Sequence, residues 1–196
     1  MTHAIRIHTP GGPEAMSWEK LDLAPPAPGE VRVRHTAVGL NYIDTYHRSG
    51  AYKLPLPSGV GQEAAGVVEA VGPGVTELKP GQRVAYGTGP IGAYCEQRNM
   101  PVDKLVPLPD GISDRDAAAM MLKGLTVQYL FRQTKVLHPG DTILFHAAAG
   151  GVGLIACQWA KALGVRMIGT VSSDEKAALA KSHGCAETIV YTRENV

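Results

Sequence analysis

Hydrophobic residues in the first half of the chain occur in short runs, several of which alternate with polar residues. Glycine and proline clusters separate these runs, for example the turn at residues 24–29. Five runs have the length and composition of β-strands, at residues 4–8, 31–38, 64–71, 83–86 and 104–106. Short strands separated by shaped turns predict a small β-barrel or sandwich up to about residue 110.

The pattern changes after the turn at residues 109–111. Ser113 and Asp116 form a helix-capping pattern before the helix formers 117–122, and a second helical pattern runs from about residue 125 to 135. Strands and helices then alternate: strands at residues 142–146, 166–171 and 187–191, and helices at 151–163 and 173–183. This β-α-β-α-β order predicts a parallel sheet with crossover helices, the first half of a doubly wound (Rossmann) domain.

Composition narrows the class of protein. With 196 residues the chain has room for one domain or two small ones, and its 44% hydrophobic content excludes a disordered tail. The net charge of +1 gives no overall field that would collect a nucleic acid. Apolar runs are too short for a membrane span or signal peptide, so we expect a cytosolic protein. The three cysteines are far apart and form no metal-binding spacing.

The most informative motif follows the strand at residues 142–146. Its loop contains only small residues and leads directly into a helix. Ala148, Gly150 and Gly153 occupy the three positions of the dinucleotide fingerprint: the tight turn, the close approach to pyrophosphate, and the close helix–strand contact. Backbone N–H groups at a helix N-terminus attract phosphate when no Cβ blocks the approach. We therefore predict a dinucleotide site here; the alternative is a glycine-rich turn needed only for packing.

The end of the following strand predicts which dinucleotide is preferred. An NAD site favours an acid there, whereas this chain has Ser172 and Ser173, with Lys176 one helical turn further on. Two hydroxyls and an ammonium suit the extra phosphate of NADPH. Ser172 and Glu175 also fit a capping box, and Asp174 or Glu175 would oppose NADPH if either pointed at the ribose.

A second polar segment lies in the β-rich half. Residues 39–46 place an amide, a carboxylate, a hydroxyl and two phenols directly after a strand. The segment is interpreted either as a loop that lines a pocket or as a short capped helix with surface tyrosines, and the pattern favours neither.

Several separated motifs together resemble the zinc-independent quinone oxidoreductase branch of the medium-chain dehydrogenase/reductase superfamily. They are residues 11–14, 41–46, 61–75, 80–84, 123–127 and 146–153. The resemblance implies an α/β protein with a GroES-like β-barrel domain at residues 1–122, which holds substrate. It also implies a Rossmann domain at residues 123–196, which binds NADPH and is truncated after its third strand.

The resemblance also implies roles for individual residues. The nicotinamide and its ribose would be bordered by Asn41, Tyr42, Ile43, Asp44, Thr45 and Tyr46. Other cofactor contacts would come from Thr126 and Tyr129, from Gly151 and Val152 at the pyrophosphate, from residues 172–176 at the 2′-phosphate, and from Tyr191 on the adenine side. The candidate catalytic residues are Asn41, Asp44, Tyr46 and Tyr52, and Tyr52 would lie at the entrance to the quinone-binding site.

The residues at the superfamily's zinc positions argue against a metal. Alcohol dehydrogenases have Cys and His ligands where this chain has residues 41–44 and Gln62. An oxygen-only ligand set is poor for zinc. Hydride transfer from NADPH to a quinone needs no Lewis acid, because the acceptor is already electrophilic; a tyrosine hydroxyl, Tyr46 or Tyr52, would donate a hydrogen bond to the oxygen that gains charge.

Two other functions remain open. One is reduction of α,β-unsaturated carbonyls such as 2-alkenals by the same chemistry, and the other is a non-catalytic, crystallin-like nucleotide-binding protein. Members of the family are about half as long again, so we expect this chain to be a fragment of a longer parent that forms a homodimer. The alternative is a truncated relative that has lost catalysis. The expected partners are NADPH and a small-molecule quinone, without a membrane or a nucleic acid.

Overall fold

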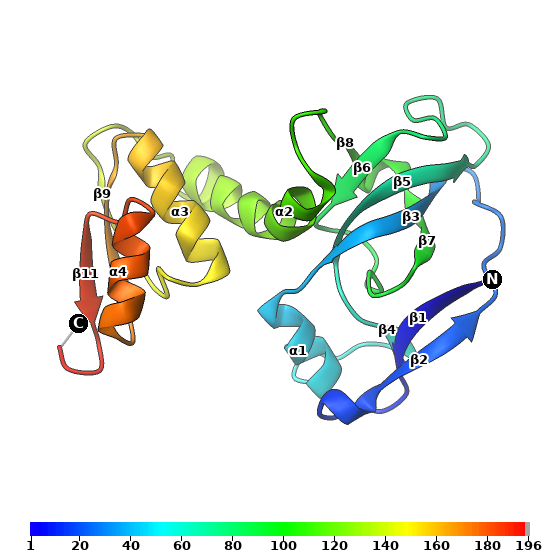
Figure 1. The fold of residues 1–196 in the computed structure, drawn as a ribbon, viewed down its shortest axis with the longest axis horizontal. Coiled ribbons are helices and arrows are strands. Elements are labelled where there is room, and N and C mark those ends of the chain that lie inside the picture. Colours follow the sequence, from blue (N-terminus) through cyan, green and yellow to red (C-terminus); the bar gives the residue numbers. More distant parts are fainter. Residues whose placement is uncertain (195–196) are drawn as a thin grey trace. The chain divides into compact units, whose positions relative to one another are not determined.

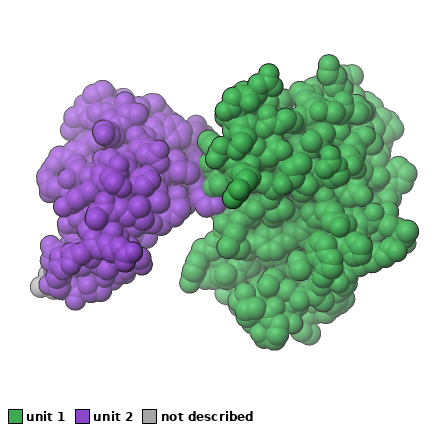
Figure 2. Space-filling model, viewed as in Figure 1, with its two compact units in different colours: residues 1–122 green, residues 123–196 purple. Residues whose placement is uncertain are grey.

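A computed structural model describes residues 1–194 of the chain, which divides into two compact units, Met1–Leu122 and Lys123–Val196 (Figure 2). The boundary falls within helix α2 (Asp114–Tyr129), so the same helix ends the first unit and begins the second.

The first unit contains two small antiparallel sheets. A five-stranded sheet has the order β7-β3-β5-β6-β8, with bounds β3 (Glu30–Gly39), β5 (Glu63–Val71), β6 (Arg83–Tyr86), β7 (Gln97–Pro101) and β8 (Val106–Pro107). A three-stranded sheet has the order β2-β1-β4, with bounds β1 (Thr2–Ile7), β2 (Met16–Leu21) and β4 (Ser58–Gly59). Short helix α1 (Tyr42–Ser49) follows β3 (Figure 1).

The core of the first unit is built mainly from valine and alanine side chains on alternate positions of the larger sheet. Val31 and Val33 on β3 and Val68 on β5 are almost completely buried, beside Tyr86 and Met100. This period of two is the reason that the sequence pattern predicts these strands well.

The predicted parallel sheet of the second unit is confirmed. Its strand order is β11-β10-β9, with bounds β9 (Thr142–Phe145), β10 (Arg166–Val171) and β11 (Glu187–Val190). Helix α3 (Gly151–Ala162) packs on β10, and α4 (Asp174–Ser182) packs on β10 and β11. The two helices also contact each other, so they cover the same face of the sheet (Figure 1).

Several local predictions were wrong. Residues 102–104 form a 3-10 turn closed by the Leu105 N–H on the Val102 carbonyl, so the predicted strand 104–106 is reduced to β8. Strands β2, β4 and β7 were not predicted. The two predicted helices around residues 117 and 125 are one continuous helix, α2, which is followed by a π-helical turn at Leu130–Thr134.

Candidate functional site

The glycine-rich loop connects β9 to α3 through an unusual backbone. Ala147 has φ +54°, in the left-handed region, and the Gly150 N–H donates to the Ala147 carbonyl at 2.8 Å. The Ala148 N–H donates to the Thr170 carbonyl on β10 at 3.1 Å. The loop is therefore tied both to itself and to the neighbouring strand, and Gly150 becomes the N-cap of α3.

Gly153 packs the first turn of α3 tightly against this loop. A Cβ at Gly153 would lie 2.5 Å from the carbonyl oxygens of both Ala147 and Ala148. At Gly150 a Cβ would lie 3.1 Å from the Ala147 carbonyl oxygen and in ordinary contact with the Ala147 side chain. The loop therefore requires glycine at position 153 for packing, whereas the backbone itself tolerates a side chain at position 150.

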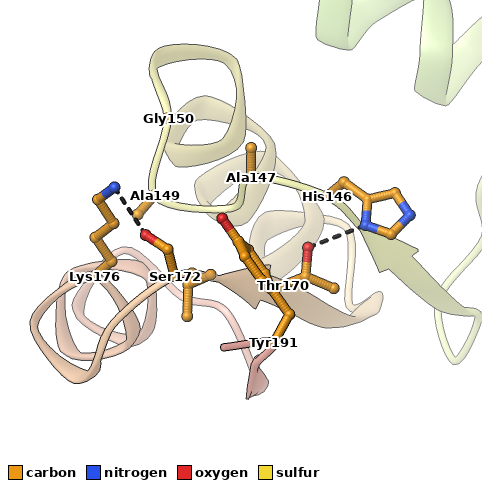
Figure 3. Close-up of a pocket in the computed structure, with 9 residues that line it drawn as sticks. His146, Ala147, Ala149, Gly150, Thr170, Ser172, Lys176 and Tyr191 are labelled. Carbon is orange, nitrogen blue, oxygen red and sulfur yellow. Dashed lines mark hydrogen bonds between the residues drawn. The ribbon is translucent and has the colours of Figure 1, made fainter. Parts of the chain in front are cut away.

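A cavity of about 480 Å³ lies beside the loop (Figure 3). It is lined by His146, Ala147, Ala149, Gly150, Thr170, Val171, Ser172, Lys176 and Tyr191. These residues come from the carboxyl ends of the three parallel strands and from the segments that follow them. Ligands of open parallel sheets bind in the crevice at that edge.

The cavity contains a hydroxyl and an ammonium group placed together. Lys176 Nζ donates to Ser172 Oγ at 3.0 Å, from the first turn of α4 back to the segment that precedes the helix (Figure 3). Ser173 does not line the cavity; its Oγ accepts the Lys176 N–H at 3.3 Å and caps α4. The N-cap is thus Ser173, and the Ser172–Glu175 capping box considered above does not form.

The acid at the start of α4 is already paired. Both carboxylate oxygens of Asp174 accept from Arg193, at 2.5 Å each, and this hydrogen-bonded pairing lowers the pKa of Asp174. The carboxylate is therefore bound to a guanidinium and does not lie among the groups that line the cavity.

The arrangement suits a phosphorylated ligand at two points. The first N–H groups of α3 have no acceptor within the helix, and the positive end of the helix dipole lies at Gly150. The Lys176 ammonium and the Ser172 hydroxyl line the same cavity, beside Ala149 of the loop (Figure 3). Tyr191, about half exposed, extends its ring across the cavity toward the loop, where it offers a flat apolar surface (Figure 3).

In the first unit, the polar segment after β3 is a capped helix, not an open loop. Asn41 is the N-cap of α1, and its N–H donates to Asp44 Oδ2 at 3.0 Å. Tyr94 donates its hydroxyl to the same carboxylate oxygen at 2.8 Å. Asn41 and Asp44 are both buried, and Asn41 Nδ2 donates to Glu63 Oε2 at 2.6 Å.

Three tyrosines form an exposed cluster on and after α1. Tyr46 contacts Tyr42 edge to face at 5.3 Å between ring centroids and contacts Tyr52 at 5.2 Å. All three side chains are more than a third exposed, so their hydroxyls are accessible to a ligand. Ile43 is half-buried, and the Thr45 hydroxyl donates to the Tyr42 carbonyl at 2.7 Å.

The predicted site residues therefore fall into two groups, one in each unit. Residues 41–46 and Tyr52 belong to the first unit, while Thr126, Tyr129, the loop and residues 172–191 belong to the second. Ser172, Lys176 and Tyr191 are brought together with the loop at one cavity. Thr126 and Tyr129 lie on α2, where Tyr129 is exposed.

Sequence reasoning missed three groups in these sites. His146 and Thr170 line the cavity and are joined by a hydrogen bond of 3.0 Å; their position at the carboxyl ends of β9 and β10 was the available signal. Glu63 lies within the motif at residues 61–75 but was not singled out there. Its complete burial could not be inferred from that pattern.

Within residues 1–194, no three or more His, Cys, Asp or Glu side chains are grouped in a way that could hold a metal ion. No helix in this described range has both the length and the apolar character needed to cross a membrane.

Two family models match the chain. Residues 27–110 match the alcohol dehydrogenase GroES-like domain, which confirms the predicted architecture of the first unit, and residues 151–196 match the zinc-binding dehydrogenase family. A quinone oxidoreductase of Pseudomonas aeruginosa is 62% identical over the whole chain, which covers 61% of that protein. A 2-haloacrylate reductase of a Burkholderia species is 47% identical, again over the whole chain, with 60% of the relative covered.

Solved structures agree with these relatives. The quinone oxidoreductase of Pseudomonas syringae has a TM-score of 0.98 and 60% identity, and the match covers all of this chain and 61% of that one. The Escherichia coli quinone oxidoreductase complexed with NADPH has a TM-score of 0.96 and 50% identity, over 98% of this chain and 60% of that one. The chain thus spans about 60% of the length of the proteins it matches.

Proposed function

Because the chain belongs to the zinc-independent quinone oxidoreductase branch of the medium-chain dehydrogenase/reductase superfamily, we propose that the whole protein is an NADPH-dependent quinone oxidoreductase. Residues 1–122 hold the substrate and residues 123–196 hold the cofactor. The observation that carries the proposal is the cavity in which the N-terminus of α3 lies beside the Ser172–Lys176 pair.

The residues at this cavity fit NADPH. Gly151 and Val152, at the N-terminus of α3, would donate backbone N–H groups to the pyrophosphate. Ser172 and Lys176 would bind the 2′-phosphate, and Tyr191 would pack on the adenosine side. The Arg193 pairing of Asp174 supports NADPH over NADH, because it occupies the carboxylate that would otherwise compete for a ribose hydroxyl.

In the first unit, the α1 segment would hold the reacting end of the cofactor and the substrate. NADPH, when bound, supplies the hydride. Asn41 and the exposed hydroxyls of Tyr46 and Tyr52 would orient the ring and donate a hydrogen bond to the quinone oxygen that gains negative charge. Asp44 would hold α1 in place through its contacts with Asn41 and Tyr94. Thr126 and Tyr129 would contribute further cofactor contacts from α2.

The direct test is a titration of the 196-residue chain with NADPH and with NADH at low salt, followed by an NADPH oxidation assay on the full-length protein with 1,4-benzoquinone. We expect saturable binding that favours NADPH, and turnover of the quinone. Tight binding without turnover would contradict the oxidoreductase function and favour a non-catalytic, crystallin-like role.

A second candidate is reduction of a conjugated carbon–carbon double bond. The observation that favours it is the similarity to a 2-haloacrylate reductase. Both reactions deliver a hydride to an electrophilic conjugated system, so the same site serves either. Comparing kcat/KM for 1,4-benzoquinone with that for a 2-alkenal separates them, and a strong preference for the alkenal would replace the quinone as substrate.

We further propose that the whole protein is a cytosolic homodimer, as the family resemblance implies. Sedimentation of the full-length protein and fractionation of its source cells test the two statements separately.

The 2′-phosphate site predicts a selective loss on substitution of Lys176. Lys176→Ala should weaken NADPH binding about tenfold, equivalent to roughly 1.4 kcal/mol, and leave NADH binding unchanged. The reason is that only NADPH carries the phosphate that the ammonium group would face. Calorimetric titration with both cofactors measures the effect.

The matched control is Lys181→Ala, because Lys181 is an exposed lysine in the last turn of the same helix, α4. It should change the affinity for neither cofactor. Equal losses of NADPH and NADH affinity in Lys176→Ala would contradict the 2′-phosphate role.

A further inference from the structure

A small cavity of about 170 Å³ lies in the first unit, lined by residues of β1, β2, β4 and β7 and of the segments beside them. Two of these residues are arginines that are far apart in the sequence, Arg6 on β1 and Arg98 on β7. A cavity of this volume has room for several water molecules or for a small ion, but not for a nucleotide. The two arginines therefore border a space in which only a small ligand fits.

The guanidinium groups of both arginines are poorly supplied with acceptors. Arg6 Nη2 donates to the Pro57 carbonyl at 2.8 Å, and Arg98 Nη2 donates to the Ile91 carbonyl at the long distance of 3.4 Å. Arg6 Nε and Arg98 Nη1 are buried and have no hydrogen-bond acceptor among the residues that the structure describes. A guanidinium is a fork of N–H donors that matches the oxygens of a carboxylate or a phosphate, so both groups have donors left for such a ligand.

Neither arginine has a carboxylate partner. Within residues 1–194 no ion pair includes Arg6, Arg98 or Asp22, the exposed residue that is the only acid lining the cavity. The charge of Arg98 reaches two neutral groups inside the unit: burial lowers the pKa of His35 and Arg98 lowers it further, while Arg98 opposes the rise that burial causes in the pKa of Tyr86. A cation partly withdrawn from water without a counter-ion is costly, and an anion in the cavity would offset that cost.

The acid that responds to the charge of Arg6 is bound elsewhere. The pKa of Glu19 is lowered chiefly by hydrogen bonds with Ser17 and His8, and least by Arg6. Its Oε1 accepts from Ser17 Oγ at 2.5 Å and lies 2.7 Å from His8 Nε2. Glu19 therefore does not act as the counter-ion of Arg6.

Two glycines that line the cavity connect the arginines. Gly59 pairs with Arg6 in the register of β4 on β1, and a Cβ at Gly59 would lie 2.6 Å from the Gly92 Cα. Gly92 has φ +124°, and a Cβ there would lie 3.7 Å from Arg98 Nη1. The contacts from Arg6 through Gly59 and Gly92 to Arg98 are thus continuous, which brings the two side chains to one cavity.

We propose that this cavity binds a small oxyanion, a phosphate or a carboxylate group, that accepts hydrogen bonds from Arg6 and Arg98 together. Two guanidinium groups without counter-ions supply the charge and the donor geometry for such a ligand. The apolar side chains of Leu21 and Ile91, which also line the cavity, limit access of water to the ion pairs that would form. The site lies wholly in the first unit and does not depend on the proposed function.

Calorimetric titration of the full-length protein with sodium phosphate and with sodium acetate, in chloride buffer at constant ionic strength, tests the site. A Lys176→Ala background weakens phosphate binding at the proposed 2′-phosphate position. We expect saturable binding of at least one of the two anions, and a loss of affinity of about tenfold or more in Arg98→Gln and in Arg6→Gln. The matched control Arg34→Gln removes an exposed arginine of the same unit, paired with Glu69, and should leave the affinity unchanged.

The preferred anion identifies the chemistry of the ligand. Stronger binding of phosphate would indicate a phosphate group, and stronger binding of acetate would indicate a carboxylate. If neither anion bound saturably, or if Arg34→Gln lost as much affinity as Arg98→Gln, the proposal would be wrong.

Thermal unfolding distinguishes a ligand site from a structural role of Arg98. In chloride alone, Arg98→Gln should be at least as stable as the Lys176→Ala parent, because it removes a charge without a counter-ion. In the anion that binds, the parent and Arg34→Gln should gain more in Tm than Arg98→Gln, since a general effect of the salt would raise all three equally. An equal loss of Tm for Arg98→Gln in both buffers would overturn the proposal. Should Arg98→Gln fail to fold, Arg6→Gln decides by the same two measurements.

Discussion

Replacement of Gly153 by alanine is expected to destabilise the second unit by about 3 kcal/mol and to abolish dinucleotide binding. A Cβ at this position would lie 2.5 Å from two backbone carbonyl oxygens, those of Ala147 and Ala148. Overpacking of this kind costs about 1–3 kcal/mol, and the upper end applies because backbone atoms must move to relieve it. The displaced atoms belong to the loop that would face the pyrophosphate, so the fold and the ligand site are lost together.

Gly150 provides the contrasting substitution in the same loop. Its φ of −80° is accessible to any residue, and a Cβ would approach a single carbonyl oxygen at 3.1 Å. Gly150→Val should therefore leave the unit folded while its branched side chain blocks the approach of the pyrophosphate, so that the affinity for NADPH and for NADH falls by about 100-fold or more, roughly 2.7 kcal/mol. Retained affinity in Gly150→Val would show that the loop has only a packing role.

Intrinsic fluorescence can follow the second unit alone. The chain has two tryptophans; Trp159 packs against the core of the second unit, and Trp18 is exposed in the first. In a Trp18→Phe background, urea unfolding followed by Trp159 gives the stability of the second unit. An unchanged unfolding midpoint in Gly153→Ala would contradict the close packing described above.

The second unit was largely predictable because its signals are local. Its helices end at glycines with positive φ, Gly164 at +70° and Gly184 at +106°, which is the backbone that glycine favours at a helix C-terminus. Its central strand, β10, is mostly buried, and all three strands are short runs rich in β-branched and other apolar residues. The cavity follows from the same topology, since Ser172 and Tyr191 both come directly after a strand.

The first unit was less predictable because several of its strands exist only through pairing. β7 has the sequence Gln-Arg-Asn-Met-Pro, in which Met100 alone is buried. Its composition does not indicate a strand, and it is extended because it pairs with β3. β2 pairs with β1 along its whole length but has no fully buried residue. Tertiary context overrides propensity in both strands.

The candidate site shows the same limit. The α1 segment was recognised as polar, but its use of Asn41 and Asp44 as a cap was one of two equal alternatives. The contact of Asn41 with Glu63 joins the start of α1 to β5. The two residues are far apart in the sequence, so no local sequence pattern predicts their contact. Similarly, nothing in the sequence predicts that His35 lies in a polar network inside the first unit.

Both ring nitrogens of His35 have hydrogen-bond partners inside the first unit. Its Nδ1 donates to the Cys95 carbonyl at 2.9 Å, and its Nε2 accepts from the Tyr86 hydroxyl at 3.0 Å. Burial lowers the pKa of His35 to about 4, with a further lowering by the positive charge of Arg98 and opposition from the Cys95 carbonyl. The folded state resists protonation because a charged imidazolium would be buried there without a carboxylate partner among the contacts of its ring.

We therefore expect the first unit to lose up to about 3 kcal/mol of stability between pH 6.5 and pH 4 through this one residue. The unfolded chain takes up a proton on His35 as the pH falls below 6.5, while the folded unit stays neutral until about pH 4. The unfolded state thus binds more protons across this window, and stability falls as the pH falls. Above pH 6.5 the contribution does not change, because both states are neutral.

Urea unfolding of the 196-residue chain at a series of pH values, followed by far-UV circular dichroism, measures this dependence. His35→Gln cannot be protonated, so its stability should be lower at about pH 7 but should fall less steeply between pH 6.5 and pH 4. The control His138→Gln removes an exposed histidine and should keep the wild-type slope. Parallel pH curves for the wild type and His35→Gln would mean that His35 is protonated in the folded protein as readily as in the unfolded chain.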